Sequence, residues 1–174
     1  MSKVLMIALL FTCSTVWAQR EFVSEEFGFS IEYPNNWIEA GKTGNSKFTV
    51  TDGRDTKGKM ALADVIDVSV TESEFDGDME AMSLSYRKTL YDRPEFIKEE
   101  ITYEKIVQFK GVKAIEIHGT AKVKTVGERL MWRMYLFEYN GNYFEITFSA
   151  SKKRFEQQDV KTIFFMAENS FTLL

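Results

Sequence analysis

His118 is the only histidine in the sequence, so it is the first side chain to consider for acid-base chemistry. Glu116 and Thr120 lie two residues to either side of it, which places all three on one face if the segment is a strand. An imidazole flanked by carboxylates and an arginine can act as an acid-base group or as a pH sensor. The same mixture of charges is typical of the solvent-exposed face of an antiparallel sheet. We favour the second interpretation.

A second candidate site consists of rings and arginines at alternate positions of residues 128–138 and of the segment that follows. Aromatic side chains mixed with arginines are typical of the centres of protein interfaces. If these side chains are exposed, we expect them to bind a protein or a glycan; the alternative is that a helix covers them. Together with His118 and Glu116, the candidate binding residues are Arg129, Arg133, Tyr135, Phe137, Tyr143 and Glu145.

The sequence lacks the residues that several other kinds of catalytic or metal-binding site require. No serine lies in a Gly-x-Ser-x-Gly motif, and no glycine-rich phosphate loop is present. A zinc site would lack a second histidine, and the acidic segment 76–80 has its glycine at the wrong position for a calcium loop. We therefore predict no metal, no cofactor and no catalytic residue. A hydrolase that uses two carboxylates stays open, because 26 acidic residues offer many pairs.

The N-terminal segment, residues 1–18, has the pattern of a secretory signal peptide. A lysine near the start precedes an apolar run, and Val16 and Ala18 are the small residues that a signal peptidase requires. The apolar run is too short for a transmembrane helix. We therefore predict an exported protein, periplasmic or secreted, whose mature chain begins at Gln19.

The mature chain, residues 19–174, contains no cysteine, because Cys13 is the only one in the sequence. It is long enough for one domain that is stabilised by its core alone. A lipid anchor at Cys13 is an alternative to cleavage after residue 18, but Thr12 fits poorly where such an anchor requires a small residue. The formal net charge of −4, without a basic stripe, speaks against a nucleic-acid partner, and no later segment could span a membrane.

Alternating apolar residues predict the strands that would position the candidate sites. The stretch FGFSIEYPNNW, Phe27–Trp37, contains a half-buried strand that ends at Pro34, because proline removes a ladder donor. Further strands are expected at residues 47–51, 62–70, 97–109, 112–123, 128–138 and 142–150.

The pairing of the last three strands can be predicted from their apolar residues. A four-residue loop, Lys124–Gly127, pairs Ile115 with Leu136 and sets Trp132 across from Gly119, where the indole can cover the bare backbone. For the next loop we choose three residues, Tyr139–Gly141. That register pairs apolar with apolar side chains: Leu136 with Phe144, Met134 with Ile146 and Trp132 with Phe148.

Two helices are expected beside these strands. The first begins at the carboxylates Asp76 and Asp78 and has its buried stripe at Met79, Met82, Ser83, Tyr86 and Leu90. The second covers about residues 155–169, with a stripe at Val160, Ile163, Phe164 and Ala167. With no repeat or linker, we predict a single α+β domain: an antiparallel sheet of about six strands flanked by helices, an α-β-α sandwich.

The order of elements, the segment Tyr33–Trp37 and the closing FFMAENSFTL resemble PsbP-like domains, which include extrinsic photosystem proteins and exported bacterial proteins. The resemblance covers about residues 20–174. It implies an α-β-α sandwich and a non-enzymatic accessory or assembly role. No metal or partner-binding residue follows from it, because no matching ligand motif is present.

The leading hypothesis for function is an exported, non-catalytic domain that binds another envelope protein through the polar-aromatic sheet face around Arg133, Tyr135 and Glu145. An alternative is a carrier of a small apolar ligand or lipid between helix and sheet, suggested by Met79 and Met82. The carboxylate hydrolase is the third hypothesis, and it requires a deep cleft that holds an acid with a raised pKa.

Overall fold

Residues 18–41, 44–54 and 63–174 are described by the computed structural model, and they form two antiparallel sheets and three helices. The main sheet has the strand order β3-β4-β5-β9-β8-β7-β6. Its strands are β3 (Ile38–Glu39), β4 (Ser46–Thr51), β5 (Val65–Glu72), β6 (Phe96–Phe109), β7 (Val112–Val123), β8 (Arg129–Tyr139) and β9 (Asn142–Ser151). The predicted α+β class is confirmed, with seven strands in this sheet rather than about six.

The second sheet has three strands and was not expected from the sequence. It contains β1 (Gln19–Ser24), β2 (Phe29–Pro34) and β10 (Thr172–Leu173), with β2 in the centre. The strand predicted in FGFSIEYPNNW is β2, and it ends at Pro34 as expected. Its neighbours come from opposite ends of the described chain, so this sheet joins the first strand to the last.

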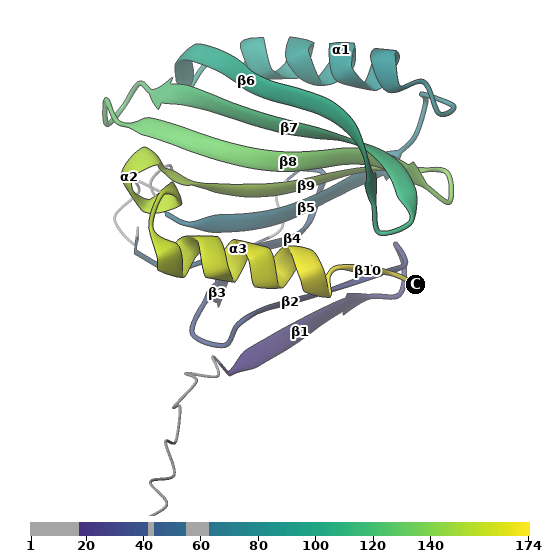
Figure 1. Cartoon of the computed structure of the whole chain (residues 1–174), viewed down its shortest axis with the longest axis horizontal. Coiled ribbons are helices and arrows are strands. Elements are labelled where there is room, and N and C mark those ends of the chain that lie inside the picture. Colours follow the sequence, from purple (N-terminus) through teal and green to yellow (C-terminus); the bar gives the residue numbers. More distant parts are fainter. Residues whose placement is uncertain (1–17, 42–43, 55–62) are drawn as a thin grey trace, which may run out of the picture.

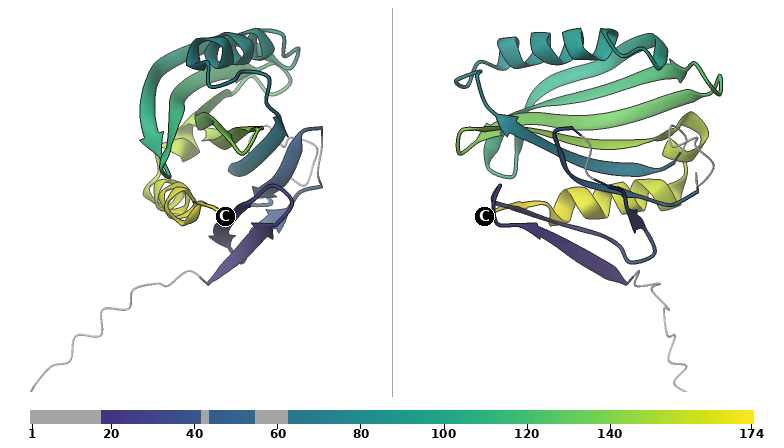
Figure 2. Two further views of the ribbon diagram at one scale, coloured as in Figure 1. Left: turned by 90° about the vertical axis from the view of Figure 1, so that its right-hand side faces the viewer. Right: turned by 180° about the vertical axis from the view of Figure 1, so that it is seen from behind.

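The helices lie on opposite sides of the main sheet (Figure 1, Figure 2). Helix α1 (Met79–Tyr91) covers one side, which we call the α1 side. The short helix α2 (Lys152–Phe155) leads into α3 (Gln158–Ser170), which lies with the three-stranded sheet on the other side, the α3 side. The predicted helix at 155–169 is therefore α3, with the separate turn α2 before it.

The core on the α1 side is formed by α1, β7 and β8. Asp78 caps the helix, since its carboxylate accepts hydrogen bonds from the amides of Glu80 at 2.9 Å and Ala81 at 3.0 Å. The predicted stripe is confirmed at Met82, Tyr86 and Leu90, all of which are buried. They pack against sheet residues that include Ile115, Ile117, Trp132, Met134 and Leu136.

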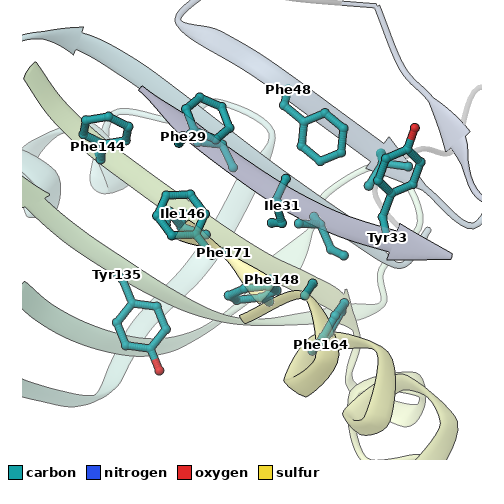
Figure 3. Close-up of a cluster of buried hydrophobic side chains, with 14 of the residues drawn as sticks. Phe29, Ile31, Tyr33, Phe48, Tyr135, Phe144, Ile146, Phe148, Phe164 and Phe171 are labelled. Carbon is teal, nitrogen blue, oxygen red and sulfur yellow. The ribbon is translucent and has the colours of Figure 1, made fainter. Parts of the chain in front are cut away.

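The core on the α3 side is rich in phenylalanine. Phe29 and Ile31 of β2 point toward the main sheet, where Phe144, Ile146 and Phe148 of β9 face them (Figure 3). Phe171 follows α3 and stacks on Phe29, with ring centroids 5.7 Å apart. The predicted stripe of α3 is buried in the same core: Val160, Ile163, Phe164 and Ala167.

The hairpin of β7 and β8 has the predicted register. Ile115 lies opposite Leu136, and Gly119 lies opposite Trp132. The indole occupies the space where a glycine β-carbon would be, so the covering of Gly119 by Trp132 is confirmed.

The hairpin of β8 and β9 has a register that differs from our prediction. Its loop is the two-residue turn Asn140-Gly141, with φ of +50° and +75°, and Tyr139 pairs with Asn142. Leu136 therefore lies opposite Glu145, and Phe137 lies opposite Phe144. The prediction was wrong because it assumed that only one side of these strands is buried, whereas α1 covers one side and α3 with β2 covers the other.

The predicted signal peptide at 1–18 and the alternative lipid site at Cys13 lie outside the described residues, apart from Ala18. Leu62, the first residue of one predicted strand, also lies outside them. Among the described residues, no helix has the length and apolar character needed to cross a membrane.

Candidate functional site

The eight candidate binding residues are divided between the two sides of the main sheet. Strand alternation places His118, Glu116, Arg133 and Tyr135 on the α3 side. The β8–β9 register places Tyr143 and Glu145 on the α1 side, beside α1. The predicted cluster of Arg133, Tyr135 and Glu145 is therefore not formed.

Two further candidate binding residues, Phe137 and Arg129, do not join either of these groups. Phe137 is fully buried, and its ring stacks on Phe144 with centroids 5.0 Å apart. Arg129 is exposed at the first residue of β8, opposite Lys122 of β7. Phe137 is thus a core residue, and Arg129 lies at the end of the strand.

Glu168 of α3 holds the two central candidates in place. Its carboxylate forms an ion pair with Arg133 and accepts a hydrogen bond from the Tyr135 hydroxyl at 2.7 Å. The Tyr135 ring also stacks on Phe109, with centroids 4.1 Å apart. Burial and the hydrogen bond to the Glu168 carboxylate raise the pKa of Tyr135. Tyr135 is therefore covered by a helix, which is the alternative that the sequence left open.

His118 remains accessible at the edge of α3. Its side chain is 40% exposed, and Nε2 lies 2.8 Å from the Glu116 carboxylate. Tyr103 of β6 packs beside it, with ring centroids 4.7 Å apart. The predicted outward orientation of His118 is confirmed, as is the inward orientation of Trp132.

A groove of about 460 Å³ lies between α3 and the sheet beside His118 and Arg133. Phe155 and Phe164 contribute apolar surface, while Phe165 lines the groove and is 65% exposed. Its other lining residues are Gln158, Lys161 and Thr162. Within the part of the chain that the structure describes, Lys161 forms no ion pair, whereas Arg133 and His118 each face a carboxylate. The groove therefore combines exposed apolar surface with a basic lining.

The α3 residues of this groove were missed by the sequence analysis, which considered only the buried stripe of the helix. Lys161, Phe165 and Glu168 recur at spacings of four and three residues, so they share one face of α3. A phenylalanine on that second face, outside the buried stripe, is the signal that could have indicated the groove.

The metal site, the apolar carrier and the carboxylate hydrolase considered from the sequence can each be checked against the structure. Over residues 18–41, 44–54 and 63–174, no three His, Cys, Asp or Glu side chains are arranged to hold a metal ion. Met82 is fully buried in the core and Met79 packs against it, so the methionines that suggested an apolar carrier fill the space under α1.

Glu145 lines a cleft on the α1 side and burial raises its pKa, which meets one condition of the hydrolase hypothesis. Its neighbour Asp67 has both carboxylate oxygens hydrogen-bonded to hydroxyl groups.

Comparisons with solved structures identify the fold. The chain superposes on the cyanobacterial PsbP of Synechocystis sp. PCC 6803 with a TM-score of 0.65 and 18% identity, over 95% of this chain and 99% of that one. The fold is PsbP-like.

Two other solved structures share this PsbP-like fold. One is the Ran-binding protein Mog1p of Saccharomyces cerevisiae, with a TM-score of 0.60 and 14% identity, over 90% of this chain and 96% of that one. The other is LpqN of Mycobacterium tuberculosis, which is involved in cell envelope biogenesis, with a TM-score of 0.55 and 11% identity, over 90% of each chain. No protein-family model and no curated protein sequence matches this chain. At these identities the likeness shows the fold alone.

Proposed function

We propose that this PsbP-like protein is an exported, non-catalytic accessory domain that binds another envelope protein. The binding site is the groove between α3 and the sheet, where Phe165 inserts into an apolar pocket of the partner. The observation that carries the proposal is the 65% exposure of Phe165 beside a groove of about 460 Å³. A large exposed ring next to a preformed groove is typical of a binding surface.

The charges of the groove indicate the chemistry of the partner. Lys161, Arg133 and His118 all line it, so a partner segment with carboxylates beside apolar side chains is complementary. Glu168 holds the Arg133 guanidinium, which leaves Lys161 as the main contact for an incoming carboxylate. This site replaces the sheet face predicted from the sequence, because α3 covers Tyr135.

The export part of the proposal is supported by the signal-peptide pattern of residues 1–18. Two proteins with the same fold are consistent with an accessory role: Mog1p binds Ran, and LpqN is involved in cell envelope biogenesis. The mass of the protein isolated from its own cells tests the export part, because a chain that begins at Gln19 is expected.

The test of the binding part uses two variants of the groove and one control. Phe165→Ala removes the exposed ring, and Lys161→Glu reverses the free charge. Leu84→Ala is the matched control, since Leu84 is 60% exposed on α1, on the other side of the sheet. Cross-linking through Lys161 in intact cells, followed by mass analysis, identifies the partner segment.

We expect a cross-linked segment that contains acidic and apolar residues. Phe165→Ala and Lys161→Glu should each weaken binding of the purified partner at least tenfold, whereas Leu84→Ala should leave the affinity unchanged. Equal affinity of all three variants would contradict the proposed site. A chain that retains residues 1–18 in the cytoplasm would contradict export without affecting the groove.

A further inference from the structure

A second cleft, of about 320 Å³, lies on the opposite side of the main sheet from the groove. Tyr143 and Glu145 of β9 line it from the sheet, and Ser85 and Arg93 line it from α1 and the segment after α1. Ser69 of β5, which pairs with Glu145 in the sheet, also lines it. The cleft is independent of the proposed protein-binding site, because the whole sheet separates them.

The Tyr143 hydroxyl is a buried polar group without a protein partner. The side chain is only 8% exposed, and among the described residues the hydroxyl forms no hydrogen bond of acceptable geometry, although the Glu145 carboxylate lies beside it. Its ring packs edge-on against Phe75, which also lines the cleft, with centroids 5.0 Å apart. Buried hydroxyl groups are nearly always hydrogen-bonded in folded proteins, so this hydroxyl points to a ligand.

Glu145 places a carboxylate next to this hydroxyl, and Arg93 is the cation whose charge acts on it. Arg93 lines the same cleft, but over the described residues Glu145 forms no ion pair with it or with any other cation. The neighbouring Asp67, whose charge also acts on Glu145, already accepts hydrogen bonds from three hydroxyl groups. These are Ser46 at 2.7 Å, Thr49 at 2.6 Å and Ser69 at 2.8 Å.

The charge of the whole cleft is negative. Glu72 and Glu74 line its exposed rim, and Glu145 lies deeper, whereas Arg93 is the one cation that lines it among the described residues. A partly buried carboxylate that forms no ion pair attracts a cation far more strongly than a neutral hydroxyl group does, because the local dielectric constant is low. Rings such as those of Tyr143 and Phe75 also attract organic cations.

We propose that this cleft binds a small organic cation that carries a primary ammonium group. The ammonium group donates hydrogen bonds to the Glu145 carboxylate and the Tyr143 hydroxyl, and the aliphatic part of the ligand lies against Phe75. In a ligand with two ammonium groups, the second one lies at the rim beside Glu72 and Glu74.

Titration calorimetry with two probes of equal length tests the proposal. The probes are 1,4-diaminobutane and the neutral 1,4-butanediol, each added to the folded protein at about 0.15 M salt, where exposed charges are largely screened. Saturable binding of the diamine and none of the diol are expected. Equal binding of the two probes would overturn the proposal, because it would show that the cleft selects hydroxyl-sized polar groups and not a positive charge. Absence of diamine binding would also overturn it.

Variants then test the assignment to individual residues. Glu145→Gln keeps the shape of the side chain and should weaken diamine binding at least tenfold, and Tyr143→Phe should weaken it several-fold. The control Glu116→Gln lies on the α3 side and should leave diamine binding unchanged.

If Glu145→Gln fails to fold, Thr89→Lys provides the second test. Thr89 is an exposed residue at the edge of the cleft, so a lysine there should compete with the ligand and abolish binding. Unchanged affinity in a folded Glu145→Gln or Thr89→Lys protein would refute the site.

Discussion

The contact between Gly119 and Trp132 shows how a single missing side chain can position a large one. The two residues pair across β7 and β8, and three atoms of the indole lie so close to the position of a β-carbon on Gly119 that they leave no space for one. Trp132 can therefore cover Gly119 and fill the space beneath α1, with only 5% of the residue exposed. This contact could be predicted from the sequence, because a four-residue loop brings the only glycine of β7 opposite the only tryptophan of β8.

We predict that Gly119→Ala destabilises the fold by about 1–3 kcal/mol, because the added methyl group forces the indole from its site. Urea denaturation measures the loss of unfolding free energy. In the double variant Gly119→Ala/Trp132→Phe, the smaller ring leaves room for the methyl group, so the loss should be smaller than the sum of the two single losses. Strict additivity would show that the two residues do not compete for space.

Glu145 shows what the sequence could not reveal at the residue scale. Its place in a strand was predicted correctly, but its side of the sheet was not, and a one-residue change of register exchanges the two sides. Burial raises the pKa of Glu145 above its ordinary value of 4.5, while Tyr143 and Arg93 lower it and Asp67 raises it further. The rim carboxylates Glu72 and Glu74 line the same cleft.

The raised pKa of Glu145 makes stability depend on pH in a defined direction. Between 4.5 and the raised pKa, the folded protein binds a proton at Glu145 that the unfolded chain has released. The contribution of Glu145 to the unfolding free energy therefore increases as the pH falls through this window. We predict that Glu145→Gln is more stable than the wild type at neutral pH and that the difference disappears in acid.

Urea denaturation between about pH 4 and about pH 8 checks the direction of this effect. Glu74→Gln is the control, because Glu74 is an exposed carboxylate of the same cleft. A Glu145→Gln protein whose stability relative to the wild type does not change with pH would contradict the effect of burial.

At the scale of elements, alternating apolar residues identified strands but could not choose between two pairings of β8 and β9. Both faces of β8 are buried over residues 134–137, so apolar residues can be matched in either register. The turn contains the better signal. Asn140-Gly141 is a favoured two-residue hairpin turn because both residues accept a positive φ, and the structure has that conformation.

We predict that Gly141→Ala destabilises the protein by about 1 kcal/mol, since its φ of +75° is unfavourable for a residue with a β-carbon. No atom lies within 4 Å of the added carbon, so the effect comes from the backbone alone. Gly41→Ala is the matched control: Gly41 also has open space around it, and its φ is not positive. Thermal denaturation of both variants should show a loss for Gly141→Ala only.

At the scale of the whole molecule, α3 and the three-stranded sheet close one side of the main sheet (Figure 2). The strand β2 was predicted, but its separation from the main sheet was not, because alternation within a strand does not specify a partner far away in sequence. The side chain of Ser170, at the end of α3, accepts a hydrogen bond from the Glu32 amide at 2.9 Å. The final residues of the chain thus connect the helix, both sheets and the aromatic core.

Phe171 tests whether this closure is a main source of stability. It is 1% exposed and lies between the two sheets, 5.7 Å from the ring of Phe29 and 5.8 Å from that of Phe109. Phe171→Ala should lower the unfolding free energy by about 3–5 kcal/mol, because it leaves a cavity where the sheets meet. Phe165→Ala, in the same part of the chain, removes an exposed ring and should change it by less than about 0.5 kcal/mol.

Urea denaturation of both variants separates stability from binding. Phe171→Ala should shift the unfolding midpoint strongly. Phe165→Ala should unfold as the wild type does and lose only the partner. If Phe165→Ala were as strongly destabilised as Phe171→Ala, Phe165 would be part of the core, and the binding role of the groove would have to be abandoned. Equal stability of Phe171→Ala and the wild type would mean that the two sheets are stabilised independently of each other.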